Sequence, residues 1–332
     1  MILTRTPFRI SLFGGGTDLP AWFNSNGGAV ISFSIDKYCH LSIREMPPYF
    51  DYKYRAVYSK IETVNEVEQI EHPAIREAIK KYGNSTKSNL EIQHHGDLPS
   101  KSGIGSSSAF VVSIIHGLNK MNNIELNKKE LSLMAIDLEQ NSIGENVGSQ
   151  DQFHAAFGGL NIIEFDKERI LIRPVIVNRE KKKLLEESML VFFTGVTRFA
   201  SDILDEQMKK TSRLDNDIYL QQLYDMVFEA EEILSEASPS TLLKSFGQLL
   251  DKGWQLKRQL SGKISNPTID EAYARGLAAG AYGGKLCGAG GGGFLLFLAP
   301  VALHSQIEKA VGLLRVNFAF EQEGSKIIYM KD

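Results

Sequence analysis

Three glycine-rich stretches lie far apart in this chain, and each of them borders an apolar segment. They read FRISLFGGGTDLP (8–20), PSKSGIGSSSAF (99–110) and KLCGAGGGGFLLF (285–297). A single cluster of glycines usually marks a turn. Three clusters beside predicted strands or helices are better explained by a bulky ligand, because backbone without side chains can approach a ligand closely. The pattern therefore favours a ligand-binding role over turns alone.

The composition is that of an ordinary globular protein. Hydrophobic residues make up 43% and charged residues 23% of the 332 residues, which is usual for a soluble domain. The net charge of −3 gives no support to a nucleic-acid or anionic-membrane partner, so any basic site must be local. We expect small-molecule ligands, no nucleic acid, and either a monomer or a homodimer.

Several features bear on the compartment. The chain has only two cysteines, Cys39 and Cys287, which favours a reducing compartment over a disulfide framework. The first residues, MILTRTPFRI, lack the long apolar core of a signal peptide. The most apolar segment, GGFLLFLAPVAL (292–303), is short and interrupted by Pro300, so it is not expected to span a bilayer. These features predict a cytoplasmic protein with no membrane partner.

The length of the chain favours two domains, because one core rarely serves 332 residues. The basic run NREKKKLLEE (178–187) is the best candidate for the boundary, and we interpret it as a solvated connector. The predicted domains are residues 1–180, which contain the central glycine-rich stretch, and residues 181–332.

Hydrophobic periodicity predicts a mixture of strands and helices. Alternation of apolar and polar residues predicts strands at 29–44 and 89–95, and an apolar run predicts another at 188–195. Apolar residues at helical spacing in 127–142 predict a helix with one buried face. The other predicted elements are helices at 72–83, 106–121, 268–281 and 303–314, a long helical region at 199–262, a hairpin of 158–165 with 169–177, and strands at 292–300 and 326–330.

The central glycine-rich stretch follows a predicted strand and precedes a predicted helix. This order points the free N–H groups of the first helical turn at the loop, where the helix dipole adds about half a positive charge. The motif G-x-x-x-x-G-K-[ST] is absent, so its lysine is missing. Lys101 is either a solvated residue or an added charge at the loop entrance. Ser106, Ser107 and Ser108 either cap the helix or bind Mg²⁺.

Carboxylates that could complete a metal or catalytic site lie in LEQNSIGENVGSQDQF (138–153). Glu139 stands at the C-terminal end of a predicted helix, where the dipole disfavours an acid, so a purely structural role is weakened. Glu145 and Asp151 follow in a turn rich in Gly, Asn and Ser. Asp151 is either a helix cap or a base or electrostatic anchor for an attacking hydroxyl.

These stretches carry a resemblance to a known family. PSKSGIGSSSA resembles the P-x-x-x-G-[LI]-G-S-S-[AS] phosphate loop of the GHMP kinases, which include galactokinase and the homoserine, mevalonate and phosphomevalonate kinases. FRISLFGGGTD and CGAGGGGF are similar to the first and third motifs of that family, in the family's order. The resemblance implies an α+β fold of two domains. The N-terminal one would be ribosomal-protein-S5-like and the C-terminal one ferredoxin-like α/β, with the active site in the cleft between them.

The resemblance also implies ATP and Mg²⁺ as cofactors and assigns roles to residues. Asp151 matches the catalytic aspartate, and Arg9 matches the basic residue that contacts it. Ser107 and Glu139 match the Mg²⁺ ligands, and Asp18 matches an acid that binds sugar hydroxyls. The residues expected at the ATP phosphates are Pro99, Lys101, Ser102, Gly103, Ile104, Gly105, Ser106, Ser107 and Ser108. Those expected at the acceptor are Gly14, Gly15, Gly16, Thr17, Asp18, Gly290, Gly291 and Arg198. The third motif is expected either to shape the acceptor pocket or to support the phosphate loop.

The first motif also bears on the acceptor. Gly15 and Gly16 stand where galactokinases typically carry Glu-His, which argues against galactose and leaves room for a larger acceptor. Together with FFTGVTRFAS (192–201), the motif resembles the branch that contains heptose 7-phosphate kinases and the kinase portion of fucokinases. The compact length favours the heptose type. It would phosphorylate the anomeric hydroxyl to give a 1,7-bisphosphate, a precursor of nucleotide-activated heptose for surface polysaccharide.

A phosphorylated acceptor needs an anion site away from the reacting hydroxyl. Arg198 is the first candidate, because a guanidinium can pair with phosphate through two hydrogen bonds. Thr197 is its neighbour, and Arg55 and Lys53 are weaker options. Alternative functions are a fucose-type sugar-1-kinase, a catalytically silent sugar- and nucleotide-binding regulator, and an ATP-dependent decarboxylase of isoprenoid type.

Overall fold

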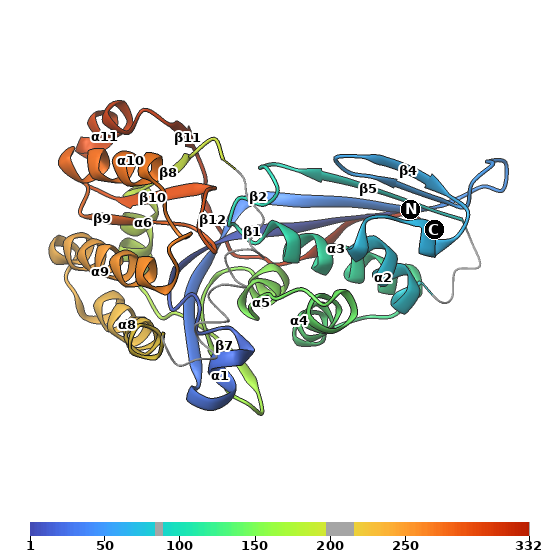
Figure 1. The fold of residues 1–332 in the computed structure, drawn as a ribbon, viewed down its shortest axis with the longest axis horizontal. Helices are drawn as coiled ribbons and strands as arrows, with labels where there is room; N and C mark the ends of the chain where they lie inside the picture. The colour runs from blue at the N-terminus through green and yellow to red at the C-terminus, as the bar shows by residue number, and fades with distance from the viewer. Residues whose placement is uncertain (84–88, 197–215, 332) are drawn as a thin grey trace.

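The computed structural model describes residues 1–83, 89–196 and 216–331. Within these ranges the chain forms two sheets, each flanked by helices (Figure 1). Buried residues of both sheets and of the helices belong to one contiguous hydrophobic core. The predicted α+β fold is therefore confirmed.

The larger sheet contains the first two strands of the chain at its centre. Its strand order is β13-β1-β2-β5-β3-β4; β6 and β12 also pair with β2, and β7 pairs with β6. Its strands are β1 (Ile2–Phe13), β2 (Gly28–Met46), β3 (Tyr54–Val57), β4 (Ile61–Val64), β5 (Asn89–Gly96), β6 (Leu160–Phe165), β7 (Ile170–Pro174), β12 (Phe320–Glu321) and β13 (Lys326–Met330). β1 and β2 are antiparallel neighbours, with Arg9 opposite Ser34.

Helices cover one face of this sheet, as Figure 1 shows for α2, α3, α4 and α5. They are α2 (Pro73–Tyr82), α3 (Ser106–Met121), α4 (Lys128–Asp137) and α5 (Gln150–Phe157). Pro73 begins α2 and two lysines close it, both of which favour a helix. The helix predicted over 127–142 changes after Asp137 into a π-helical segment, Leu138–Ile143. A short helix, α1 (Pro20–Asn26), joins β1 to β2, and two 3₁₀ turns, Val67–Gln69 and Val301–Leu303, complete the set of short elements.

The smaller sheet has the strand order β11-β8-β10-β9 and lies beside the larger one (Figure 1). Its strands are β8 (Met189–Phe193), β9 (Gly283–Leu286), β10 (Phe294–Leu298) and β11 (Leu314–Val316). The helices around it are α6 (Arg179–Glu187), α8 (Asp217–Glu236), α9 (Pro239–Leu260), α10 (Pro267–Ala278) and α11 (His304–Val311). The apolar runs of β8 and β10 pair as antiparallel neighbours. All residues of the two strands are buried except Phe193, which is half-buried.

The basic run 178–187 is the clearest correction to the predicted elements. We interpreted it as a solvated connector, but it forms α6, which Asn178 caps by accepting a hydrogen bond from the backbone N–H of Lys181. Lys181 and Leu185 are buried, and the Lys181 ammonium donates to the carbonyl oxygens of Leu234 and Ser235 at 3.1 and 2.7 Å. The charged residues of this run made its amphipathic helix hard to predict. A lysine can bury its aliphatic chain while its ammonium donates hydrogen bonds to backbone oxygens.

The long helical region predicted at 199–262 is divided in its second part. Two helices, α8 and α9, meet at Ala237, and Pro239 begins the second of them. Residues 197–215 lie outside the described residues, so the first part of this prediction is not addressed.

The last strands of the chain return to the larger sheet. β12 pairs with β2 and β13 pairs with β1, where Met330 lies opposite Ile2. The backbone of Lys331 exchanges hydrogen bonds with that of Met1. A boundary near residue 180 stays a prediction, but residues 320–330 pair with the sheet of the N-terminal part.

Candidate active site

The second and third glycine-rich stretches touch each other through their backbones. Side chains would not fit there: a Cβ on Gly103 would lie 2.4 Å from the carbonyl oxygen of Cys287, and one on Gly288 would lie 2.2 Å from Gly103 Cα. A Cβ on Gly293 would lie 2.0 Å from the carbonyl oxygen of Ser102. The third stretch therefore packs directly against the second stretch, the predicted phosphate loop, and its function toward the phosphates or the acceptor stays a prediction.

The first stretch reaches the same loop through Arg9 on β1. The Arg9 backbone N–H donates to the Ile104 carbonyl oxygen at 3.0 Å, and its guanidinium donates to the Gly103 carbonyl oxygen at 2.7 Å. Residues about 90 positions apart in sequence are thereby held together. Lys285 on β9 adds a further tie, because its buried ammonium donates to the carbonyl oxygens of Ser11 and Leu12, both at 2.8 Å.

The predicted pair of Arg9 and Asp151 is present in the structure. Arg9 Nε donates to Asp151 Oδ1 and Arg9 Nη2 to Oδ2, each at 2.7 Å, which is the two-bond geometry that gives the strongest arginine–carboxylate pairs. The Arg9 side chain is 7% exposed and that of Asp151 is 23% exposed. Asp151 lies in the first turn of α5 and makes no capping hydrogen bond, so the cap interpretation is wrong. Its carboxylate is oriented by Arg9 and still partly open.

The phosphate loop ends directly on α3, as expected. Gly105, in the left-handed conformation, precedes the first turn, and no side chain caps the helix. The serines are therefore not N-caps but first-turn residues, and the N–H groups of this turn are left for a ligand. A Cβ on Gly105 would lie 3.3 Å from Arg9 Cγ and 3.4 Å from Asp151 Oδ2, so the loop borders the Arg9–Asp151 pair. Lys101 is exposed and has a left-handed backbone, φ 58°.

Glu139 lies in a buried pocket beside α3. Its carboxylate has no exposed surface and accepts from the Ser108 hydroxyl at 2.9 and 3.0 Å and from the Gln152 side-chain amide. Burial raises the pKa of Glu139 to about 8, against these hydrogen bonds, which lower it. In the described ranges no lysine or arginine forms an ion pair with it. Glu139 is the second residue of the π-helical segment Leu138–Ile143, a distortion common at functional sites.

The two predicted Mg²⁺ ligands are placed differently. Glu139 is buried, whereas Ser107 is exposed, and the serine that contacts Glu139 is its neighbour Ser108. Ser107 as a ligand stays a prediction. Among the described residues no group of three or more His, Cys, Asp or Glu side chains could hold a metal ion. Mg²⁺ is usually bound by one or two carboxylates together with the phosphates of a substrate. Glu139 fits this pattern, because it is a buried carboxylate with no lysine or arginine partner among the described residues and lies beside a serine hydroxyl at the predicted phosphate loop.

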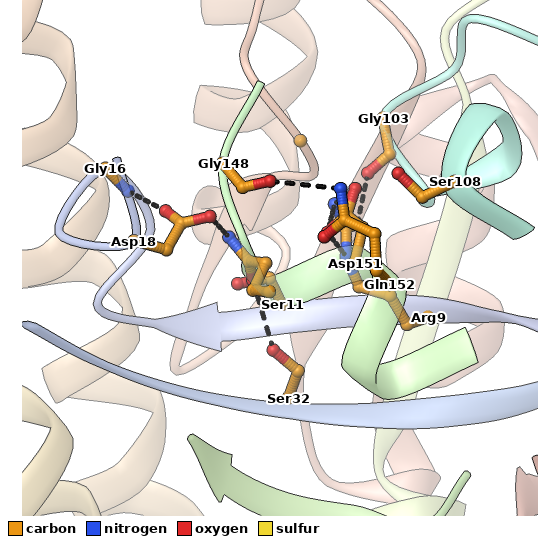
Figure 2. A network of polar contacts seen from close by, with 12 residues as sticks. Arg9, Ser11, Gly16, Asp18, Ser32, Gly103, Ser108, Gly148, Asp151 and Gln152 are labelled. Atoms are coloured by element: carbon orange, nitrogen blue, oxygen red, sulfur yellow. Dashed lines mark hydrogen bonds and ion pairs between the residues drawn. The ribbon is translucent and has the colours of Figure 1, made fainter. Parts of the chain in front are cut away.

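Asp18 lies on the other side of the α5 N-terminus from the phosphate loop (Figure 2). Its carboxylate is buried and accepts from the Gly16 backbone N–H and from the Gln150 side-chain amide, both at 2.9 Å. Burial raises the pKa of Asp18, and the charge of Asp151 acts in the same direction. A Cβ on Gly148 would lie 1.9 Å from Asp18 Oδ2, so GSQDQ approaches this acid closely. Each carboxylate oxygen can accept a further hydrogen bond.

The other residues of the first motif shape the turn that presents Asp18. Gly14 has φ +80°, and a Cβ there would lie 1.9 Å from the Ala29 carbonyl oxygen. Thr17 is fully buried, and its hydroxyl donates to the carbonyl oxygens of Gly14 and Ala29 at 2.8 Å. Gly16 has φ +109°. Contacts of these residues with an acceptor stay predictions.

Four more predicted acceptor residues have definite neighbours. Gly290 and Gly291 lie against Ile264, to whose carbonyl oxygen the Gly291 N–H donates at 2.9 Å. Arg55 pairs with buried Glu91 on the larger sheet, and Lys53 pairs with exposed Glu66 at 3.5 Å, so these two cations already have acidic partners. Arg198 and Thr197 lie outside the described residues.

Sequence reasoning missed Lys257, Gln150 and Gln152. Lys257 projects from α9, is 8% exposed, and donates to the carbonyl oxygen of Gly288. Burial lowers the pKa of Lys257 to about 8. A signal existed, because Lys257 interrupts an apolar stripe of α9 formed by Phe246, Leu250, Trp254 and Leu260. The two glutamines flank Asp151 in GSQDQ and bond Asp18 and Glu139.

Two family profiles match this chain, in which the structure brings together a glycine-rich loop, a paired aspartate and a buried carboxylate. GHMP kinases N terminal domain matches residues 68–159, and GHMP kinases C terminal matches residues 234–311. The chain belongs to the GHMP kinases, enzymes that transfer phosphate to a hydroxyl group.

Within that family the similarity is to sugar kinases. The chain is 29% identical to D-glycero-alpha-D-manno-heptose 7-phosphate kinase of Campylobacter jejuni over 98% of both chains. It is 25% identical to L-fucokinase/L-fucose-1-P guanylyltransferase of Bacteroides fragilis, with 89% of this chain matching 34% of that larger protein. The chain is therefore a sugar kinase of the GHMP family.

Solved structures agree on the fold. A D-glycero-D-manno-heptose 1-phosphate kinase from Bacteroides thetaiotaomicron superimposes over the whole of both chains with a TM-score of 0.79 and 21% identity. Galactokinase of Lactococcus lactis, in complex with galactose, gives a TM-score of 0.73 at 19% identity over 98% of this chain and 95% of its own. No helix in the described part of the chain is both long and apolar enough to cross a membrane.

Proposed function

We propose that this kinase transfers the γ-phosphate of ATP to the anomeric hydroxyl of D-glycero-D-manno-heptose 7-phosphate, giving the 1,7-bisphosphate. The observation that carries the proposal is the full-length similarity to the Campylobacter jejuni heptose 7-phosphate kinase, combined with glycine at positions 15 and 16. These glycines leave room for a larger acceptor. The reaction would take place in the cytoplasm. Its product would be a precursor of the nucleotide-activated heptose used for lipopolysaccharide or capsule.

In this mechanism, Asp151 orients the acceptor hydroxyl and accepts its proton as the hydroxyl oxygen attacks the γ-phosphorus of ATP. The bond between the γ-phosphorus and the β,γ-bridging oxygen breaks, and ADP leaves with that electron pair. The bidentate pair with Arg9 fixes the carboxylate, and the partly exposed side of Asp151 faces the acceptor. Arg9 also neutralises charge that develops on the transferred group. Phosphoryl transfer depends mainly on such alignment and charge compensation.

The phosphate loop would hold the nucleotide. The N–H groups of the first turn of α3, which no side chain caps, are the donors for the phosphates. Glu139, with the hydroxyl of Ser107 or Ser108, would hold Mg²⁺, whose charge offsets that of the phosphates when it is bound. A bound cation beside Glu139 would favour the ionised carboxylate over the neutral acid that burial favours.

Asp18 would select the acceptor. Its two oxygens are held by Gly16 and Gln150, and each can still accept from a sugar hydroxyl. A buried carboxylate that accepts hydrogen bonds suits a polyol. An L-fucose acceptor is the second candidate, supported by the similarity to the kinase portion of the Bacteroides fragilis protein.

The test is a coupled assay of ADP release with Mg²⁺-ATP and one acceptor at a time: heptose 7-phosphate, the unphosphorylated heptose, fucose or galactose. We expect turnover mainly with heptose 7-phosphate. Asp151→Asn should lower kcat by about 10²–10⁴-fold, because the amide cannot accept the proton. The KM for ATP should change much less than kcat. Efficient turnover of fucose alone would replace the heptose proposal, and full activity of the Asn variant would refute the role of Asp151.

A further inference from the structure

Lys257 is a buried cation whose hydrogen-bonding capacity is only partly used. Its ammonium has three N–H donors. In the part of the chain that the structure describes, it has a single hydrogen-bond acceptor, the carbonyl oxygen of Gly288. Lys285, the other buried lysine nearby, differs because it bonds the two carbonyl oxygens of Ser11 and Leu12. Lys257 thus has two donors left for a ligand, whereas Lys285 has one.

A second polar group with unused capacity lies beside it. The hydroxyl of Ser11 is buried and has no hydrogen-bond partner among the described residues. The point where a Cβ on Gly15 would stand is 3.7 Å from Lys257 Nζ and 3.8 Å from Ser11 Oγ. Among the described residues other than Gly15 and its two chain neighbours, no further atom lies within 4 Å of that point. The absence of a side chain at Gly15 leaves this point bordered by an ammonium and a hydroxyl.

The charges around Lys257 place it on the acceptor side of the site. Asp18, the predicted acceptor ligand, is its strongest acidic neighbour and Asp151 a weaker one. Arg9 repels it, but Arg9 is paired with Asp151. Burial of an ammonium with one acceptor is costly, and an anion bound to it would offset that cost. A lysine is a compact charge that suits a phosphate group.

We propose that Lys257 Nζ and Ser11 Oγ, beside Gly15, bind the phosphate group that the acceptor sugar already carries and that is not transferred. This inference rests on the proposed function, since it requires a phosphorylated acceptor. It makes Lys257 a specificity-determining residue from the C-terminal part of the chain, in contact with the first motif of the N-terminal part. It also explains why Gly15 and Gly16 stand where galactokinases typically carry Glu-His. A glutamate at position 15 would place a carboxylate, which repels phosphate, beside the site.

The test measures a preference rather than an activity. The ratio of kcat/KM for heptose 7-phosphate to kcat/KM for the unphosphorylated heptose is determined for the wild type and for Lys257→Met. We expect this ratio to fall by about ten- to a hundredfold, because that factor corresponds to the free energy contributed by one hydrogen bond to a charged group. Lys252→Met, on the exposed side of the same helix, is the matched control and should leave the ratio unchanged.

Gly15→Ala provides a variant that keeps the lysine. Its methyl group would lie in ordinary contact with Nζ, at 3.7 Å, so the fold should be retained while the phosphate position is obstructed. The ratio should again fall at least tenfold, at an unchanged melting temperature. If both variants keep the wild-type ratio, or lose both activities equally, the inference is wrong. A wild type that prefers unphosphorylated sugars would instead refute the proposed function itself.

Discussion

The contact between Gly288 and Gly103 allows a quantitative test of how the third motif works. In Gly288→Ala the new methyl carbon would lie 2.2 Å from Gly103 Cα, where real Cβ atoms essentially never come within 3.0 Å. Neither partner is a flexible side chain, so one backbone segment must move. We expect the phosphate loop to be displaced, and with it the carbonyl oxygen of Gly103 that accepts the hydrogen bond from Arg9.

The expected cost has two contributions. Gly288 has φ +72°, a conformation that costs a non-glycine residue about 1–2 kcal/mol. Overpacking against the loop adds about 1–3 kcal/mol. Gly312 is a matched control, because it has φ +68° and no atom of the described residues lies within 4 Å of its Cβ position. Gly312→Ala should therefore show the first contribution alone.

The two variants are compared by urea unfolding and by steady-state kinetics. We expect Gly288→Ala to lose about 1–3 kcal/mol more of the free energy of unfolding than Gly312→Ala. Its KM for ATP should rise at least tenfold, and its KM for the acceptor much less. Equal losses in the two variants with an unchanged KM for ATP would refute the reasoning. A rise confined to the acceptor KM would instead assign the third motif to the acceptor pocket.

Two further predictions concern buried charges. The pKa of Glu139 is about 8 in the folded protein and near 4.5 when unfolded, so without Mg²⁺ its contribution to stability falls as pH rises from 4.5 to 8. Glu139→Gln should therefore gain stability relative to wild type across that window in chemical unfolding, and a constant difference would contradict this. Lys181→Met should lose about 1–2 kcal/mol in the free energy of unfolding through its two carbonyl contacts, whereas Lys183→Met, at 71% exposure, should lose almost nothing.

Much of the fold could be predicted because its signals are local. The alternation in 29–44 and the proline and glycine around 72–83 describe the same residues that form β2 and α2. The pair of Arg9 and Asp151 could be named because the motifs that hold the two residues resemble those of the GHMP kinases, in which these positions contact each other. The signals for β2 and α2 lie within a few consecutive residues, whereas this pair depended on the resemblance.

The misses have a common physical origin, which is long-range burial of polar groups. Lys257 and Lys181 look like surface residues in sequence, yet each is buried and donates to carbonyl oxygens of a distant segment. The return of β13 to β1 likewise depends on partners more than 300 residues apart. The serines do not cap α3, because Gly105 takes the N-cap position directly before Ser106. Of these outcomes, the burial of Lys257 alone had a local signal, since this lysine interrupts the apolar stripe of α9.

The pairing of β13 with β1 has a consequence for how the protein is made. β1 leaves the ribosome more than 300 residues before its outer neighbour in the sheet, β13 (Lys326–Met330). During synthesis the far edge of β1 therefore lacks its native partner, and an unpaired edge is a template for aggregation. Nascent chains that stall before residue 326 would keep that edge open, so protection by a chaperone would matter most until β13 emerges.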